Sequence, residues 1–459
     1  MKIEVGKDVV LHNLSEKLVN HLKSELTVDN LNYTRAVEAG RSTYGIPEKL
    51  SSFHYDPIGN VGVVPRGYLD TLIQHLSTEN MAFDLIDTRP DFKKFDTRIS
   101  TGHEPRNYQI KAAAVMYLHS SGILVAPAGT GKTVAGLVLA MYIGKPCLWL
   151  THLERLAQQA REKAFEFFDL EEEDVGYMGG GKFTTGKKLT VALVQTLFRR
   201  DLRQHENDFY TIMVDEVHHT PARTFLQTVG RFSTRKIYGL TATPRRRDGL
   251  EALMLHHIGP VIYSLRNKVH VDNYIMLPTV VFKFTKVKPE FDVHHEGITK
   301  LIQNRSRNEM IVRDIVREAA VDGNVCMVLT TRVAHAELLH LLLKHVGIKV
   351  EIMTGPMNRF SLEKSLENLK KGESNVVVCT TGLLGEGFDL PQINRIFLTI
   401  PISGNNPTLL EQCIGRGQRP WPGKKNTLIF DYVDSGGLFW NQYQGRKKTY
   451  QYLGVREDR

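Results

Sequence analysis

A glycine-rich segment at residues 126–133 has the composition of a loop that binds a triphosphate. It reads Ala-Pro-Ala-Gly-Thr-Gly-Lys-Thr and lies between a strand-like and a helix-like apolar stretch. Such a loop turns backbone N–H groups toward phosphate oxygens at the start of a helix. Lys132 would reach the β- and γ-phosphates, and Thr133 would bind Mg²⁺. The candidate nucleotide-binding residues of this loop are Pro127, Ala128, Gly129, Thr130, Gly131, Lys132 and Thr133.

An acidic pair, Asp215-Glu216, ends a second apolar stretch at residues 210–214. Asp215 would hold the metal, and Glu216 would orient and deprotonate the water that attacks the γ-phosphate. An isolated acidic pair at the end of a strand is more often a solvated turn, so this assignment depends on the phosphate loop upstream. Together the two segments predict hydrolysis of a nucleoside triphosphate, with Thr133 and Asp215 as the metal ligands.

The size and charge of the chain limit the classes of protein to which it can belong. Its 459 residues exceed what one hydrophobic core usually supports, so we expect two or three domains. A formal net charge of +9 favours a polyanionic partner. No apolar stretch is long enough to cross a membrane, and the N-terminal residues lack a signal core. The cysteines form no Cys-x-x-Cys pair, and we expect them to be reduced and buried in a cytoplasmic protein: Cys147, Cys326, Cys379 and Cys413.

Apolar strand-like stretches alternate with helical patterns in two regions of the chain. This alternation predicts parallel sheets with both faces covered by helices. We therefore expect an α/β fold with a small accessory domain at 1–96, which ends in a linker-like stretch, and two similar domains at 97–268 and 269–459. The strand-like stretches are residues 122–125, 147–150, 190–194, 212–214, 237–240, 325–329, 350–352, 376–379, 395–398 and 428–430.

The motifs between residues 104 and 435 resemble, in content and order, those of helicase superfamily 2. The acidic pair begins the sequence Asp-Glu-Val-His, which is the DExH form of the family's second nucleotide motif. Residues 106–109 resemble the adenine-reading segment, with Arg106 and Gln109 as nucleotide ligands. Residues 241–243 resemble the motif that couples the two halves. The resemblance implies two tandem RecA-like parallel-sheet domains after an α+β N-terminal domain, and ATP with Mg²⁺ as cofactors.

The resemblance also assigns nucleotide contacts to the second domain, which has no phosphate loop of its own. A guanidinium near the γ-phosphate can raise the rate by about 10³–10⁵-fold. Arg419 is the stronger candidate for this role, and Arg416 is also suited to ground-state phosphate binding. A surface patch for nucleic acid is the alternative for these arginines. The residues that the family motifs imply are Gly387, Asp389, Gln412, Arg416 and Arg419.

His218, at the end of the DExH motif, has two interpretations. In the family, the residue at the position of His218 bonds to the second domain and couples hydrolysis to movement. The alternative is a histidine that caps the following segment. The adjacent histidine pairs elsewhere in the chain predict no metal site, because neighbouring side chains point in different directions and no carboxylates accompany them.

Contacts with nucleic acid are implied by family motifs at the ends of several predicted strands. Thr, Gln and backbone N–H groups are suited to the phosphate backbone, so we expect little readout of base sequence. A motor that moves over any sequence needs this property. The candidate residues are Thr151, His152, Arg155, Gln195, Thr196, Thr330, Arg332, Thr354 and Thr380.

Two further segments each have two interpretations. Residues 176–188 are rich in glycine and lysine, which fits a flexible loop against a phosphate backbone or a plain hairpin turn. Residues 416–459 mix basic and aromatic side chains, which fits stacking on unpaired bases or a packed terminal helix with a solvated basic face.

Residues 240–248 resemble the XPB-like branch and the phage UvsW-like branch-migration enzymes, although Arg247 stands where the XPB branch has an acid. We therefore expect an ATP-dependent DNA helicase or translocase in replication, recombination or repair. It would unwind or branch-migrate forked or branched DNA and single-strand/duplex junctions, as a monomer in the cytoplasm of a bacterial or phage-infected cell. An RNA helicase, and an ATP-driven nucleic-acid clamp without processive unwinding, are the alternatives.

Overall fold

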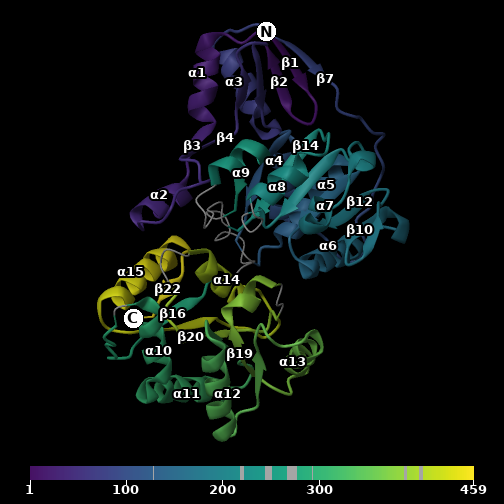
Figure 1. Ribbon diagram of the computed structural model, residues 1–459. Helices are drawn as coiled ribbons and strands as arrows, with labels where there is room; N and C mark the ends of the chain where they lie inside the picture. Colours follow the sequence, from purple (N-terminus) through teal and green to yellow (C-terminus); the bar gives the residue numbers. More distant parts are fainter. Residues whose placement is uncertain are drawn as a thin grey trace. The chain divides into compact units, whose positions relative to one another are not determined.

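The computed structural model describes residues 1–127, 129–217, 222–242, 251–265, 276–291, 293–386, 390–402 and 407–458 (Figure 1). Contacts between residues divide the chain into two units. The first unit comprises Met1–Ala126 and Gly131–Leu265, and the second comprises Pro127–Thr130 and Arg266–Arg459. Each unit has its own sheets and its own buried core.

A five-stranded sheet with the order β5-β6-β2-β1-β7 begins the first unit. Buried and half-buried residues alternate along its central strands, as expected when one face carries the core. Helices α1 and α3 contribute leucines at i, i+4 spacing to that core. The elements are β1 (Lys2–Val5), β2 (Val9–His12), α1 (Glu16–Glu25), β3 (Thr27–Asp29), α2 (Leu31–Glu38), β4 (Lys49–Ser51), β5 (His54–Asp56), β6 (Val61–Val64), α3 (Leu69–Thr78) and β7 (Asp84–Asp87).

A buried arginine joins this N-terminal region to the rest of the first unit. The Arg66 guanidinium donates to the backbone oxygens of Thr234 and Val229, at 3.1 Å each, and to the Thr234 hydroxyl at 2.8 Å. Burial lowers the pKa of Arg66 to about 10, so the group stays charged at neutral pH. A Cβ on the adjacent Gly67 would lie 2.3 Å from the carbonyl carbon of His257, so this close approach needs glycine.

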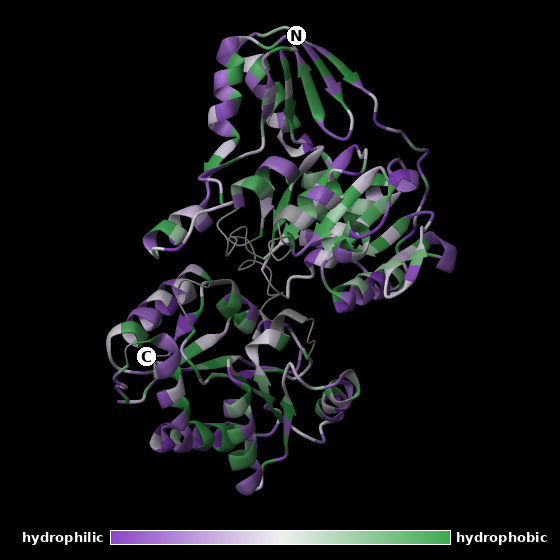
Figure 2. Ribbon diagram, viewed as in Figure 1, coloured by the Kyte–Doolittle hydropathy of each residue, from purple (hydrophilic) through white to green (hydrophobic). Residues whose placement is uncertain are grey.

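An eight-stranded sheet, with the order β11-β10-β12-β9-β13-β14-β8-β15, forms the centre of the first unit. Neighbouring strands are parallel except for β10 and β11. Its central strands are buried along their whole length, and Figure 2 shows hydrophobic residues concentrated there. The elements are α4 (Asn107–Tyr117), β8 (Ser121–Val125), α5 (Lys132–Ile143), β9 (Cys147–Thr151), α6 (Glu154–Phe167), β10 (Val175–Gly179), β11 (Lys182–Thr184), β12 (Leu189–Leu193), α7 (Val194–Phe198), β13 (Thr211–Asp215), α8 (Ala222–Val229), β14 (Lys236–Thr241), α9 (Glu251–Ile258) and β15 (Val261–Ser264).

The second unit is built on a seven-stranded sheet with the order β18-β19-β17-β20-β21-β16-β22. All of its neighbouring strands are parallel. The elements are β16 (Thr279–Phe284), α10 (His294–Gln303), α11 (Arg305–Ala319), β17 (Cys326–Thr330), α12 (Val333–His345), β18 (Val350–Met353), α13 (Arg359–Lys371), β19 (Val376–Thr380), β20 (Arg395–Leu398), α14 (Pro407–Gly417), β21 (Leu428–Val433), α15 (Gly437–Tyr452) and β22 (Arg456–Glu457).

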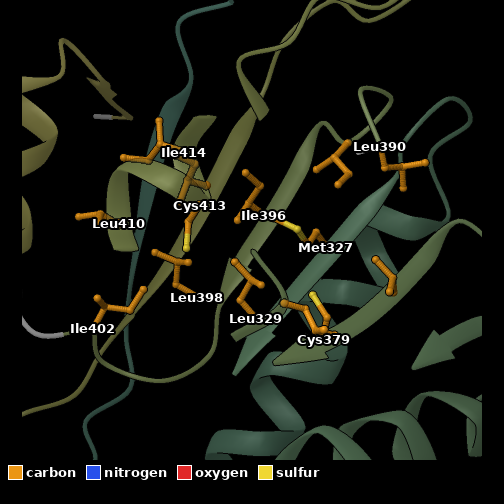
Figure 3. Packing of buried hydrophobic residues seen from close by; sticks show 14 of the residues in the cluster. Met327, Leu329, Cys379, Leu390, Ile396, Leu398, Ile402, Leu410, Cys413 and Ile414 are labelled. Carbon is orange, nitrogen blue, oxygen red and sulfur yellow. The ribbon is translucent and has the colours of Figure 1, made fainter. Parts of the chain in front are cut away.

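Helix α14 is fixed on this sheet by Leu410, Cys413 and Ile414 (Figure 3). Residues with this spacing lie on one face of a helix, and they pack into the same core as Ile396 and Leu398 of β20. Residues two positions from Leu410 and Ile414 along the helix lie on its other face. The packing of α14 therefore directs Gln412 and Arg416 away from the core.

The ten apolar stretches that we identified in the sequence all lie in parallel strands. Residues 190–194 and 325–329 differ from the observed strands by one residue at each end. The α/β fold with two parallel-sheet, RecA-like domains is therefore confirmed. The four cysteines are free and buried, as expected. The division at residues 96 and 268 stays a prediction.

The flexible-loop interpretation of residues 176–188 is wrong. This segment forms the antiparallel hairpin of β10 and β11, and Gly176 lies within β10. A Cβ on Gly176 would lie 2.2 Å from the backbone nitrogen of Gly186. Gly176 and Gly186 therefore allow two backbones to pack closely, which is the opposite of providing a mobile loop.

The stacking interpretation of residues 416–459 is wrong for three of the aromatic side chains. Tyr432, Tyr443 and Tyr450 are buried. The Tyr450 hydroxyl donates to an Asp431 carboxylate oxygen at 3.1 Å, so this side chain is part of the core. The segment contains a packed terminal helix, α15, and stacking on bases stays a prediction for the exposed Trp421, Trp440 and Tyr452.

A buried ion pair in the second unit predicts a large effect of a single substitution on stability. Arg307 Nε lies 2.7 Å from Asp434 Oδ1, and neither side chain is exposed to solvent. We expect Asp434→Ala to lower the free energy of unfolding by about 3–5 kcal/mol, because the guanidinium would stay buried without its partner. Urea unfolding followed by circular dichroism measures the change.

The matched control is Glu309→Ala, which removes the partner of the exposed Arg305. It should leave the unfolding midpoint unchanged, because exposed ion pairs contribute little. Equal, small effects of the two substitutions would contradict the importance of the buried pair.

Candidate active site

Three neighbouring strands bring the nucleotide motifs to one edge of the first unit's sheet. Strand β14 pairs in parallel with both β13 and β8, so the carboxyl ends of all three meet. Asp215 ends β13, Thr241 ends β14, and the phosphate loop follows β8. The Thr241 backbone oxygen accepts a hydrogen bond from Ala126 N–H at 2.9 Å, which joins β14 to the start of the loop. Open parallel sheets bind their ligands at this edge.

The phosphate loop has a conformation that requires glycine. Gly129 and Gly131 have φ of 85° and 70°, in the left-handed region. A Cβ on Gly131 would also lie 2.5 Å from Nε2 of Gln109. The Thr130 hydroxyl donates to the backbone oxygen of Pro127 at 2.7 Å. Helix α5 begins at Lys132, so its first N–H groups and the positive end of its dipole lie at the loop, where they favour an anion.

Gln109 connects the predicted adenine-reading segment to the phosphate loop. Its Nε2 donates to the backbone oxygen of Gly131 at 3.1 Å, and its Oε1 accepts from Arg106 N–H at 2.8 Å. The Arg106 guanidinium donates to the Tyr108 hydroxyl at 3.0 Å. These bonds place the start of α4 beside the loop. The predicted base contacts of Arg106 and Gln109 stay predictions, and the bond to the loop is a second role that the sequence did not indicate.

Four polar side chains meet at the end of β13. Lys132 Nζ lies 2.6 Å from Glu216 Oε1, and Thr133 Oγ1 donates to Asp215 Oδ2 at 3.4 Å. The Glu216 backbone N–H donates to Asp215 Oδ1 at 3.0 Å. Glu216 has φ of 48°, a left-handed conformation that costs about 1–2 kcal/mol for a residue with a Cβ. Backbone strain of this kind is concentrated at functional sites.

The electrostatics of this cluster fit a divalent cation. Asp215 is 3% exposed, and burial together with the Glu216 carboxylate raises its pKa. A nearby cation would favour the charged form. The oxygens of Asp215 and Thr133 are hard ligands of the type that Mg²⁺ prefers, and Mg²⁺ takes its remaining ligands from water and phosphate. Within the described ranges, no group of three or more His, Cys, Asp or Glu side chains could hold a metal ion.

The next two strands on the same edge carry candidate nucleic-acid contacts. Strand β9 pairs in parallel with both β13 and β12. Gln195, which follows β12, donates from Nε2 to the backbone oxygen of His152 at 3.0 Å. Gln195 is exposed, whereas His152, Arg155 and Thr196 are partly buried. Thr151 has no solvent exposure, so a contact through its side chain would need a local rearrangement.

Three strands of the second unit carry a corresponding set of candidate nucleic-acid contacts. Thr354 follows β18, Thr380 ends β19, and Thr330 ends β17, and these strands are neighbours. All three threonines are buried, with side chains that are 5%, 7% and 1% exposed. Arg332 is exposed. Their roles in binding nucleic acid stay predictions, and burial makes Thr330 better suited to supporting Arg332 than to direct contact.

The sequence reasoning did not single out Thr331, which is exposed beside Arg332. Both residues line a cavity of about 300 Å³, together with His294 and His295. The available signal was the position of Thr331, which follows directly after β17, a strand that is buried along its whole length. Where Thr330 faces inward, Thr331 is the residue that can face solvent.

A neutral histidine orients Thr330. His335 Nδ1 lies 3.0 Å from Thr330 Oγ1, and its Nε2 lies 3.2 Å from Asn308 Oδ1. Asn308 Nδ2 donates to the Ile302 backbone oxygen, which turns Oδ1 toward the ring. The proton of neutral His335 is therefore on Nε2, and Nδ1 accepts from the Thr330 hydroxyl. Burial, with a smaller effect of the Arg307 guanidinium, lowers the pKa of His335 to about 3.

The predicted catalytic residues of the second unit lie on or just after α14. Gln412 and Arg416 are on the helix, and Arg419 follows its last residue, Gly417. Several other predicted positions lie outside the described residues, so their assignments stay predictions: Ala128, His218, Gly387, Asp389 and the triplet 246–248. No helix in the part of the chain that the structure describes has the length and hydrophobicity to span a bilayer.

Comparison with known proteins is consistent with this geometry. The family model "Type III restriction enzyme, res subunit" matches residues 102–246, and "Helicase conserved C-terminal domain" matches residues 307–420. "Probable helicase D10" of Escherichia phage T5 is 26% identical over 334 residues, which are 71% of this chain and 70% of that protein. "DNA 3'-5' translocase XPB2" of Sulfurisphaera tokodaii is 23% identical over 333 residues, which are 63% of this chain and 73% of that protein.

A solved structure shows the same fold. The structure of S. cerevisiae Dbp5 bound to RNA and ADP BeF3 aligns with a TM-score of 0.56 at 14% identity, and covers 78% of this chain and 90% of that chain. The two parallel-sheet domains and the two matched family models define a nucleic-acid helicase. The chain carries the two conserved helicase regions of superfamily 2 and is similar to XPB and phage helicases.

The depressed pKa of His335 predicts a loss of stability in acid. The unfolded state takes up a proton near pH 6.5, whereas folded His335 does so only near its pKa of about 3. Its contribution to stability is therefore complete above pH 6.5 and falls by up to about 1.4 kcal/mol per pH unit as the pH drops toward 3. Unfolding free energies measured between pH 7.5 and 4.5 test this expectation.

The variants His335→Gln and His345→Gln provide the comparison, since His345 is exposed at the end of the same helix. His335→Gln should show a shallower dependence on pH than the unmodified protein, and His345→Gln should not. An identical pH dependence in all three proteins would contradict the assignment.

Proposed function

We propose that this protein is an ATP-dependent DNA helicase or translocase, with its ATP site at the carboxyl ends of β8, β14 and β13. The observation that carries the proposal is the cluster of Lys132, Glu216, Thr133 and Asp215 beside the phosphate loop. In this arrangement a cation, two carboxylates and a hydroxyl lie within direct reach of one another. Phosphoryl transfer needs these groups, because it is catalysed mainly by positioning and neutralisation of charge.

Each side chain of the cluster would have a separate task. The N–H groups at the start of α5 and the Lys132 ammonium would bind the phosphates. Thr133 and Asp215 would hold Mg²⁺, which withdraws charge from the phosphate oxygens when it is bound. Glu216 would orient the attacking water and accept its proton. Gln412, Arg416 and Arg419 would add donors and positive charge from the second domain, as the family motifs imply.

The first test concerns the hydrolytic residues. We expect Lys132→Ala and Glu216→Gln each to lower kcat for ATP by at least about 10³-fold, because one loses phosphate binding and the other loses the base. Both proteins should remain folded. A coupled ADP-release assay with saturating DNA measures the rates, and circular dichroism checks the fold.

Lys187→Ala and Glu173→Gln form a matched control, since these two residues make an exposed ion pair in the same unit. They should retain the rate of the unmodified protein. Multiple-turnover hydrolysis that persists in both Lys132→Ala and Glu216→Gln would rule out this ATP site.

One line of support favours DNA, and two more favour a nucleic acid of either kind. One relative carries the printed name DNA 3'-5' translocase. The candidate contacts are side chains suited to phosphate at the carboxyl ends of β9, β12 and β17. The net charge of +9 favours a polyanion. We assign residues 97–268 and 269–459 to the two motor domains, and residues 1–96 to recognition of forked or branched DNA.

The second test identifies the polymer and the activity. ATP hydrolysis and strand separation should be measured with single-stranded, duplex, forked and four-way DNA, and with the RNA equivalents. We expect the greatest stimulation by forked or four-way DNA, together with unwinding or branch migration. Stimulation by RNA alone would identify an RNA helicase and overturn the DNA assignment. Stimulation without any strand movement would identify an ATP-driven clamp.

A further inference from the structure

Lys424 donates hydrogen bonds to three backbone oxygens around the end of α14. Its Nζ lies 2.6 Å from the oxygen of Gly417, 2.9 Å from that of Arg419 and 3.3 Å from that of Pro391. The last backbone oxygens of a helix have no partner within it and carry the negative end of its dipole. An ammonium group offers three N–H donors, which matches this set of acceptors.

A rigid turn returns Lys424 to the helix. The Lys424 backbone N–H donates to the oxygen of Trp421 at 3.0 Å, and Gly423 has φ of 81°. Pro422 comes before this glycine, and a proline followed by a left-handed glycine is typical of a type II turn. The oxygen of Gly417 also accepts from the Thr427 hydroxyl at 2.8 Å. The turn and this second bond hold residues 421–427 against the end of α14, where the ammonium group meets its acceptors.

The three oxygens belong to two segments that the family motifs assign to the nucleotide. Gly417 and Arg419 are in the segment 412–419, which carries the two candidate arginines. Pro391 ends the segment 385–391, which carries other candidate nucleotide contacts. One side chain thus ties the two segments together.

The surroundings of Lys424 disfavour its charged form. Burial and the neighbouring Arg419 guanidinium lower the pKa of Lys424 to about 7. An apolar side chain could fill the same space without this cost. The lysine is kept there beside Arg419, a predicted functional residue, and its bonds hold the backbone of that residue.

We infer that Lys424 is a positioning residue for ATP hydrolysis. It holds the turn that follows Gly417, so that the side chains of Arg416 and Arg419 act on the nucleotide. This inference rests on the proposed function, because it requires that hydrolysis depend on these arginines. It extends that function to a lysine that lies outside the segment 412–419.

The test separates kcat from binding. We expect Lys424→Met to lower kcat for DNA-stimulated ATP hydrolysis by about 10–100-fold, because small displacements of catalytic groups have effects of this size. The KM for ATP and the affinity for a fluorescent ATP analogue should stay within about threefold, since the binding groups of the phosphate loop are untouched. Lys424→Arg, which keeps the charge and several donors, should recover at least part of the lost kcat.

The matched control is Lys425→Met, because Lys425 is the adjacent lysine and is exposed. It should hydrolyse ATP at the rate of the unmodified protein. If Lys424→Met is as active as Lys425→Met, the inference is overturned. The same holds if Lys424→Met and Lys424→Arg lose nucleotide affinity and thermal stability together with kcat, because Lys424 would then be a structural residue only.

Two reference variants separate this inference from the proposed function. Glu216→Gln and Arg419→Ala should each bind the ATP analogue and fail to hydrolyse ATP. An active Glu216→Gln protein would overturn the proposed ATP site itself. An active Arg419→Ala protein beside an inactive Glu216→Gln protein would overturn the inference about Lys424 and the proposed role of Arg419, and would leave the ATP site at Lys132 and Glu216 in place.

Discussion

The parallel pairing of β13, β14 and β8 is the constraint on which the candidate active site depends. Because these strands run in the same direction, Asp215, Thr241 and the phosphate loop lie at one edge of the sheet although they are far apart in the sequence. Strands β9 and β12 continue that edge, and the bond from Gln195 to the backbone of His152 joins their ends. One sheet edge thus carries both the nucleotide motifs and the candidate contacts to a polymer.

Buried charges have two different roles in this protein. Arg446 and Asp431 form two hydrogen bonds of 2.8 and 2.9 Å within the core of the second unit, so the charges satisfy each other. Asp215 is different, because it is buried beside a second carboxylate and its pKa is raised. Glu216 adds a strained backbone to the same place. Strain and unfavourable charge together distinguish a site prepared for a ligand from a satisfied structural pair.

The fold could be predicted from the sequence because its signals are local. Continuous apolar stretches bounded by polar residues are buried parallel strands, and all ten that we identified are strands of the two large sheets. The phosphate loop was equally clear, since glycine, lysine and threonine occur there at a fixed spacing. The wrong predictions concerned glycine and tyrosine, which can each serve more than one structural role. Gly176 allows close backbone packing and not mobility, and Tyr432 and Tyr450 fill a core and are not available for stacking on bases.

The sequence by itself determined the strands, the phosphate loop, the acidic pair and the superfamily, because each signal depends on residues that are close together in the sequence. Only the tertiary structure decided which side chains support them. Gln109 bonds to Gly131, His335 orients Thr330, and Lys424 closes the end of α14. Contacts of this kind depend on how separate segments pack, and no local spacing encodes them. A lysine that follows Pro-Gly has the pattern of an exposed turn, and only the position of the helix end makes it the partner of three backbone oxygens.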